Sequence, residues 1–163
     1  MVTERLRRAG GTRGAPPPLS DAALVEAFEG CSLPARQFHH EEHVRVVWFS
    51  LATRSLVQIL EWFPAALRRY ADSVGRPDLY HETITWVLIL LIHERRRRAS
   101  EASNWKTFAE ANPDLFLWPA VVARYYRSGT LDSRQAREFF LLPDLLAHGA
   151  EDQVPSGEVR PPG

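Results

Sequence analysis

Two short segments of this 163-residue sequence hold side chains that can bind a metal ion or move a proton. The first is FHHEEH, residues 38–43, in which His40 and His43 are three positions apart. On a helix this spacing places both imidazoles on one face, about 60° apart. Such a pair can bind one metal ion, or one ring can orient the other for proton transfer. The alternative is a polar helix start whose side chains are solvated.

The second segment is YHETIT, residues 80–85, which leads into the most apolar stretch of the chain. Polar groups at the start of a buried element need hydrogen-bond partners. Glu82 is a candidate catalytic acid or base, with His81 beside it and Tyr80 placed to orient a substrate. The alternative is that His81 and the threonines cap the helix and form hydrogen bonds in the core.

Together the segments offer His40, His43 and His81 as metal ligands, with Glu82 as a further ligand or as the general base for a bound water. Two histidines plus a third histidine or a carboxylate are a common ligand set for Zn or Fe(II) in helical proteins. A site without metal would instead use Glu82 and a histidine as an acid/base pair. Either interpretation requires that the two segments face each other.

Aromatic and hydroxyl side chains near these segments are predicted to line a substrate pocket. Trp86 follows the second segment directly and can wall a pocket for an aromatic ligand. Thr85 lies four positions after His81 and shares its helix face, and Trp48 belongs to the helix that the first segment begins. The sequence has no glycine-rich phosphate loop, no GxSxG motif and no dinucleotide fingerprint.

Composition restricts the environment and the partners. The single cysteine, Cys31, excludes an intrachain disulfide and a thiolate zinc cluster, which fits the cytoplasm. The start of the chain lacks the apolar core of a signal peptide. Twenty basic and twenty acidic residues balance, so no net field attracts nucleic acid or an anionic membrane. We therefore expect a small-molecule substrate and neither a nucleic-acid nor a membrane partner, and the sequence leaves a homodimer open.

Apolar residues recur at helical spacing along most of the chain, and no segment alternates strictly between apolar and polar residues. We predict an all-α fold, a compact single-domain bundle of about five to seven helices over residues 19–148. Residues 1–18 and 149–163 are rich in Pro and Gly and are predicted to be disordered. The predicted helices cover, approximately, residues 21–29, 39–51, 55–74 with a break or kink at Pro64, 80–98, 105–111, 114–128 and 133–141. A strand over 83–92 is the alternative for the most apolar stretch.

Five segments resemble those of a family of small, uncharacterised bacterial all-helical proteins that carry FxHxxHVR and YHETIT motifs. They are FHHEEHVR (38–45), YHETITW (80–86), NPDL (112–115), the pair Tyr125-Tyr126, and LPD (142–144). The resemblance spans roughly residues 36–145. It implies that His40, His43, His81 and Glu82 belong to the family pattern, and it implies no particular activity. A role in bacterial secondary metabolism is a general expectation for proteins of this kind.

The sequence thus predicts a small-molecule enzyme with a His/Glu-lined pocket that binds a divalent metal, Zn or Fe. One alternative is a metal-free acid/base catalyst of a cyclisation, condensation or elimination. Another is a non-catalytic helical binding module. In a further alternative, the His-Glu set serves only as buried hydrogen-bonding groups.

Overall fold

The computed structural model describes residues 19–99 and 104–145, and every regular element in these two ranges is helical. The predicted all-α fold is therefore confirmed, and the alternative of a strand over residues 83–92 is wrong. The predicted disordered ends, residues 1–18 and 149–163, lie outside the described residues, as do the last three residues of the predicted domain. Among the described helices, none combines the length and the hydropathy that a membrane span requires.

Six α-helices form within the described ranges: α1 (Asp21–Glu29), α2 (His40–Ser50), α3 (Leu56–Ser73), α4 (Glu82–Arg98), α5 (Trp105–Ala111) and α6 (Arg134–Glu138). Four short 3-10 turns lie between them: η1 (Ala35–Gln37), η2 (Pro77–Leu79), η3 (Pro113–Phe116) and η4 (Val122–Arg124).

Local side-chain caps determine where most of these helices begin. The hydroxyl of Ser20 accepts a hydrogen bond from the amide of Ala23 at the start of α1. Ser55 and Gln58 form a reciprocal capping box at the start of α3, and Asn104 does the same with the third residue of α5. Each cap satisfies amides that have no partner inside the helix. These three starts were predictable from the sequence because a cap involves residues only three positions apart.

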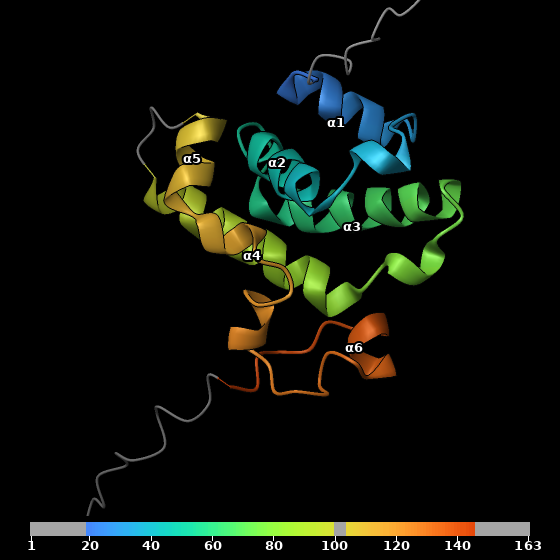
Figure 1. Cartoon of the computed structure of the whole chain (residues 1–163), viewed down its shortest axis with the longest axis vertical. Coiled ribbons are helices and arrows are strands. Elements are labelled where there is room, and N and C mark those ends of the chain that lie inside the picture. Colours follow the sequence, from blue (N-terminus) through green and yellow to red (C-terminus); the bar gives the residue numbers. More distant parts are fainter. Residues whose placement is uncertain (1–18, 100–103, 146–163) are drawn as a thin grey trace, which may run out of the picture.

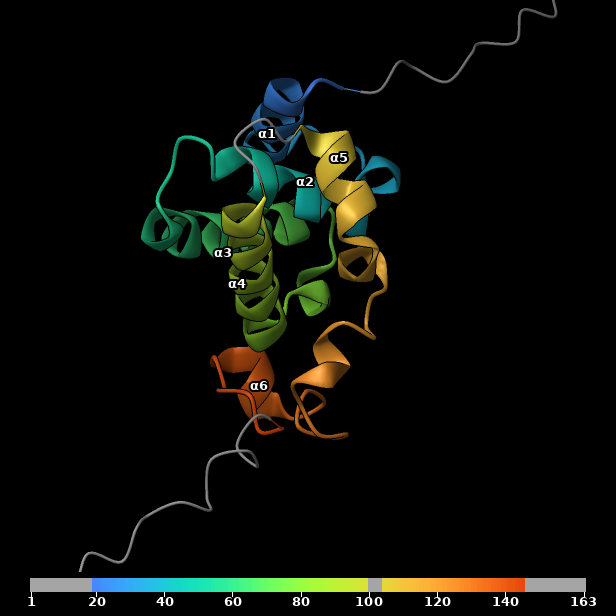
Figure 2. The ribbon, with the colours of Figure 1, turned by 90° about the vertical axis from the view of Figure 1, so that its left-hand side faces the viewer.

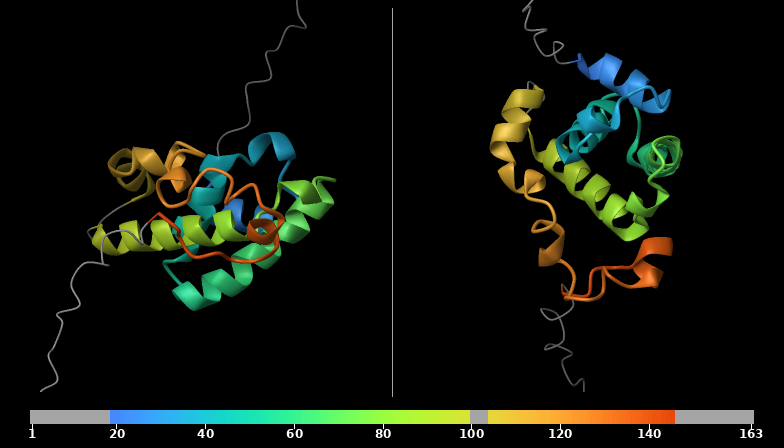
Figure 3. Two further views of the ribbon diagram at one scale, coloured as in Figure 1. Left: turned by 90° about the horizontal axis from the view of Figure 1, so that it is seen from below. Right: turned by 45° about the vertical axis from the view of Figure 1, so that its right-hand side comes forward.

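Helix α4 is the centre of the bundle, and it packs against α2, α3 and α6. Helices α1 and α6 lie at opposite ends of the molecule (Figures 1 and 2). The segment between α5 and α6 runs alongside α4 along the length of the molecule (Figure 3). Because α4 has neighbours on several sides, its buried residues do not form one stripe. This burial explains the long apolar run that the sequence shows there.

Helix α3 continues through Pro64, so the predicted break at this residue is wrong. Proline removes one backbone hydrogen bond and crowds the preceding turn, which normally interrupts a helix. Here Phe63, Ala66 and Tyr70 lie on both sides of the proline and are all buried in the same core. Burial of this common face offsets the lost hydrogen bond.

The predicted helix over residues 114–128 is also wrong, because the structure has only the turns η3 and η4 there. Pro119 disfavours helical backbone at the residue before it, Trp118. The predicted last helix is shorter than expected and ends at Glu138. After Glu138, backbone groups bond to Thr83 of α4 instead of continuing the helix. The Thr83 hydroxyl donates to the carbonyl of Phe139 at 2.8 Å and accepts from the amide of Leu141 at 3.1 Å.

Candidate functional site

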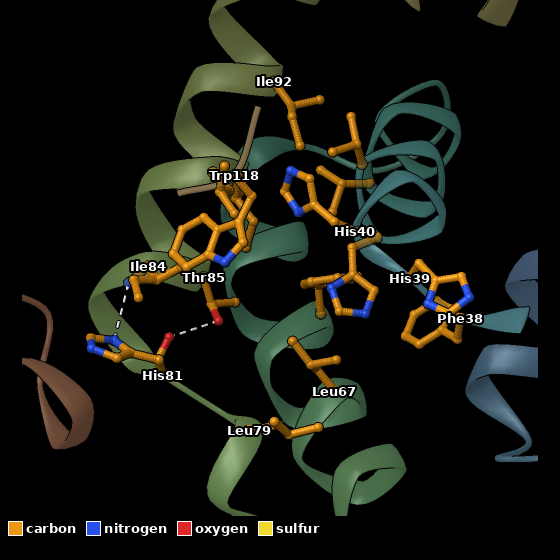
Figure 4. A pocket seen from close by; sticks show the side chains of 16 residues that line it. Phe38, His39, His40, Leu67, Leu79, His81, Ile84, Thr85, Ile92 and Trp118 are labelled. Carbon is orange, nitrogen blue, oxygen red and sulfur yellow. Dashed lines mark hydrogen bonds between the residues drawn. The ribbon is translucent and has the colours of Figure 1, made fainter. Parts of the chain in front are cut away.

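A cavity of about 280 Å³ lies between α2, α3 and α4, close to the lower end of the roughly 300 to 1,000 Å³ typical of ligand pockets. Its lining is mostly apolar and includes Val47 of α2, Phe63 and Leu67 of α3, and Ile89 of α4 (Figure 4). Trp118, from the segment that follows α5, also lines it. The other polar groups in the lining belong to histidines and one threonine, besides the indole N–H of Trp118.

His40 is the first residue of α2 and reaches across to the segment after α5. Its Nε2 lies 2.7 Å from the carbonyl oxygen of Leu115. A carbonyl only accepts, so in the neutral ring Nε2 carries the proton and Nδ1 is the open acceptor. The ring also lies 6.1 Å from that of Trp118, centroid to centroid. Half-buried and oriented by a backbone group, His40 is set up to accept a proton or a hydrogen bond.

His43 lies one helical turn further along α2 and lines the same cavity. Its ring packs against Phe38, with 4.2 Å between the ring centroids. None of the residues in the described ranges forms a hydrogen bond with this ring. Burial, together with the smaller effects of the nearby His40 and His39, lowers the pKa of His43 to about 3. His43 is therefore neutral at physiological pH, with one ring N–H to donate and one nitrogen to accept.

His81 borders the cavity, but its ring points away from His40 and Trp118 (Figure 4). It is the N-cap of α4, where Nδ1 accepts a hydrogen bond from the amide of Ile84 at 3.4 Å. Nε2 lies 2.7 Å from the carbonyl oxygen of Leu131 and donates to it. Both ring nitrogens are thus engaged. The structure brings His40 and His43 together but does not aim the His81 ring at them.

Thr85, the predicted pocket residue nearest to His81, does line the cavity. Its hydroxyl donates a hydrogen bond to the carbonyl oxygen of His81 at 2.8 Å (Figure 4). Thr85 therefore closes the first turn of α4 while its side chain contributes to the cavity wall.

Glu82 and Tyr80 form a separate cluster with Arg68 of α3, outside the cavity lining. The Tyr80 hydroxyl donates to Glu82 Oε2 at 2.5 Å, and the Arg68 guanidinium donates to the same oxygen. The guanidinium also lies over the Tyr80 ring, 4.3 Å from its centroid. Burial and the bonded Glu82 carboxylate raise the pKa of Tyr80. The cluster ties α3 to the start of α4, and it does not place Glu82 beside His40 or His43.

Two predicted pocket tryptophans also lie outside the cavity lining. Trp86 stacks on Phe140, with 5.3 Å between centroids and planes 24° apart. Trp48 packs against Trp105 and Phe108 at 5.6 and 5.8 Å. The tryptophan that does line the cavity, Trp118, was not predicted, because it comes from a segment remote in sequence.

The remaining segments of the resemblance hold the C-terminal part of the chain in place. Asp114 accepts hydrogen bonds from Arg95 of α4 and from Arg124. The Tyr126 hydroxyl donates to the carbonyl of Leu141 at 2.7 Å. Asp144 accepts from the Thr130 hydroxyl and from the amide of Arg127. The roles of these side chains in the described structure are thus architectural.

A metal ion requires at least three well-placed ligands in most protein sites. Within residues 19–99 and 104–145, no group of three or more His, Cys, Asp or Glu side chains is arranged to hold one. His40 and His43 would be two donors without a third from the described part of the chain. This donor set fits hydrogen bonding to an organic molecule better than it fits a metal ion.

Comparisons with known proteins add no assignment. The chain matches no protein-family model, no curated protein and no solved structure.

Proposed function

We propose that this protein binds a small, largely apolar organic molecule in the cavity, with His43 and His40 making the polar contacts. The observation that carries the proposal is the ring of His43, which faces an apolar cavity without a hydrogen bond to any described residue. A fully buried polar group without a partner destabilises a protein by about 1 to 3 kcal/mol, and the partly buried His43 ring bears a share of this cost. A bound molecule that hydrogen bonds to His43 would remove this cost.

His81 shows what a structural histidine looks like in the same protein. Both of its nitrogens are bonded, and only 7% of its surface is exposed. His43 is more exposed than His81, and its ring has no such bonds. The contrast supports a ligand-binding role for His43 over a purely structural one.

A second candidate function is acid/base catalysis on the bound molecule, and the geometry of His40 favours it. Its Nε2–H is held by the carbonyl of Leu115, which leaves Nδ1 as the proton acceptor. In catalytic triads, likewise, an acceptor binds the N–H of one ring nitrogen, and the other ring nitrogen takes up the proton. An elimination, isomerisation or cyclisation would use such a group as its base. We further propose a cytoplasmic location, from the single cysteine, and a place in bacterial secondary metabolism.

The binding proposal is tested by filling the cavity. Leu88 lines it, whereas Leu90 on the same helix is exposed and lies outside the lining. We expect small neutral aromatic molecules to shift amide resonances of the cavity residues in the wild type and in Leu90→Trp. The same shifts should vanish in Leu88→Trp while its circular dichroism stays helical. Equal binding to both variants, or no binding to the wild type, would contradict the proposal.

The metal hypothesis has its own test, by elemental analysis of the purified, untagged protein beside a His40→Ala/His43→Ala variant. We expect no metal that depends on the two histidines. Near-stoichiometric Zn or Fe in the wild type and none in the variant would replace the organic-ligand proposal with a metal site.

A further inference from the structure

The charge of the cavity lining restricts what the proposed site can hold. Among the described residues that line it there is no Asp, Glu, Lys or Arg. Two arginines of the surrounding helices are already paired: Arg68 bonds to Glu82, and Arg95 to Asp114. The lining therefore provides no charged side chain, and neither Arg68 nor Arg95 is left unpaired to neutralise a charged ligand.

The polar groups of the lining are also almost fully engaged with the protein. The ring of His39 contacts the carbonyl oxygen of Arg36 at 2.9 Å. His40, His81 and Thr85 each bond to a backbone carbonyl, at 2.7, 2.7 and 2.8 Å. Of the histidines and the threonine in the lining, His43 alone has no hydrogen bond to any described residue. The lining thus contains the open ring of His43, an acceptor at His40 Nδ1 and the indole N–H of the partly exposed Trp118.

We infer that the site selects an uncharged molecule with a single hydroxyl or carbonyl group on an apolar body, and rejects carboxylates and amines of the same shape. This inference rests on the proposed binding function and specifies its ligand class. A charged group placed in an apolar cavity without a counter-charge loses its hydration and gains no ion pair. A neutral hydroxyl or carbonyl loses much less and regains a hydrogen bond to His43. The lowered pKa of His43 agrees with this, because its ring resists the protonation that would pair it with an anion.

The size of the cavity and the polarity of its rim indicate how large the apolar part of the ligand is and how it is oriented. A cavity of about 150 Å³ lined by aliphatic and aromatic side chains holds benzene. The 280 Å³ here would accommodate a two-ring molecule. Leu79 and Trp118 line the cavity and are 62% and 41% exposed, so a large part of the rim that solvent reaches is apolar, with the exposed His39 as its polar member. The end of the ligand that faces the rim is therefore expected to be apolar as well.

Four probes of one shape test the inference: naphthalene, 2-naphthol, 2-naphthoate and 2-naphthylmethylamine, titrated into the full chain at pH 7.5 and followed by amide chemical shifts. We expect 2-naphthol to bind the wild type at least roughly tenfold more tightly than the anion or the cation. In His43→Leu its affinity should fall roughly threefold to tenfold, the value of one hydrogen bond. Naphthalene, which has no polar group, should bind His43→Leu at least as tightly as the wild type. His93→Gln, on α4 but outside the lining, is the matched control and should leave all four affinities unchanged.

The outcomes separate the inference from the proposed function. If 2-naphthoate or the amine binds as tightly as 2-naphthol, and Leu88→Trp abolishes this binding, the site is real but the inferred selectivity for neutral molecules is wrong. If 2-naphthol keeps its affinity in His43→Leu, His43 is not the group that recognises the ligand. If no probe binds, or if all bind Leu88→Trp as they bind the wild type, the proposed function itself is overturned.

Discussion

His40, His43 and His81 have the same side chain, yet their positions on the helices give them different tasks. His81 precedes the first turn of α4 and caps it. His40 begins α2 and reaches the carbonyl of Leu115. His43 lies inside α2 and lines the cavity, and its ring has no hydrogen bond to a described residue. A histidine can therefore serve as a cap, an oriented acceptor or an open polar group within one small fold.

Acidification should destabilise the protein through His43. Its pKa is lowered to about 3 in the folded chain, whereas an unfolded histidine has the ordinary value of 6.5. Between these values the unfolded chain binds a proton that the folded chain does not, so the free energy of unfolding falls as the pH falls from 6.5 towards 3. The contribution is at most about 1.4 kcal/mol per pH unit. Chemical denaturation of the wild type and His43→Leu between pH 7 and 4.5 measures it, and parallel pH profiles would contradict the expected excess slope of the wild type.

Thr83 is a second residue whose effect can be measured directly. Its fully buried hydroxyl bonds to both Phe139 and Leu141, and so joins α4 to the end of the described chain. Thr83→Val keeps the shape and removes both bonds, so the free energy of unfolding should fall by about 1 to 3 kcal/mol. Thr53→Val, at an exposed position, is the control and should change it by less than about 0.5 kcal/mol. Equal effects of the two substitutions would show that the Thr83 bonds contribute little.

At the scale of the elements, α4 organises the molecule because other segments are tied to both of its ends. Near its start, Glu82 binds Arg68 of α3 and the hydroxyl of Tyr80. Near its end, Arg95 binds Asp114. The middle of the helix contributes one wall of the cavity. Polar ties at the ends and apolar packing between them hold α4 in register with its neighbours.

Glu82→Gln separates the observed role of this residue from the predicted catalytic one. The substitution weakens the bonds to Arg68 and Tyr80, so stability should fall by about 1 kcal/mol, a small effect because the Arg68 side chain is half exposed. Affinity for 2-naphthol should not change, since Glu82 lies outside the cavity lining. Glu94→Gln, which breaks an exposed pair with Arg98 on the same helix, is the control. A selective loss of ligand binding in Glu82→Gln would instead support the role in the site that the sequence predicted.

At the scale of the whole molecule, the cavity exists only because distant parts of the chain meet. Helices α2, α3 and α4 form its walls, and Trp118 reaches it from the segment between α5 and α6. That segment has little regular structure of its own, and Asp114 holds it through two arginines. The position of Trp118 therefore depends on side-chain bonds made several residues away.

Asp114→Asn should loosen this segment and weaken ligand binding together. Loss of the carboxylate leaves the partly buried Arg95 without its ion pair, so stability should fall by about 1.5 to 3 kcal/mol. Amides of residues 113–128 should exchange with solvent faster than in the wild type, and the affinity for 2-naphthol should fall because Trp118 is less well held. Asp78→Asn, in an exposed pair with Arg76, should leave both measurements unchanged. Unaltered exchange in Asp114→Asn would show that the segment is held by other contacts.

The amino-acid sequence by itself determined the helical class, most helix starts and the shared face of His40 and His43. These features depend on residues within about four positions of one another, through caps and helical periodicity. Only the tertiary structure decided that α3 continues through Pro64, that residues 114–128 do not form a helix, and that Trp118 rather than Trp86 or Trp48 lines the cavity. The sequence also did not predict which side chains of α4 point toward which neighbouring helix. A helix that is buried on several sides has no single apolar stripe from which its contacts could be predicted. The contacts between these side chains depend on packing between segments far apart in the chain. Local sequence patterns do not specify such packing.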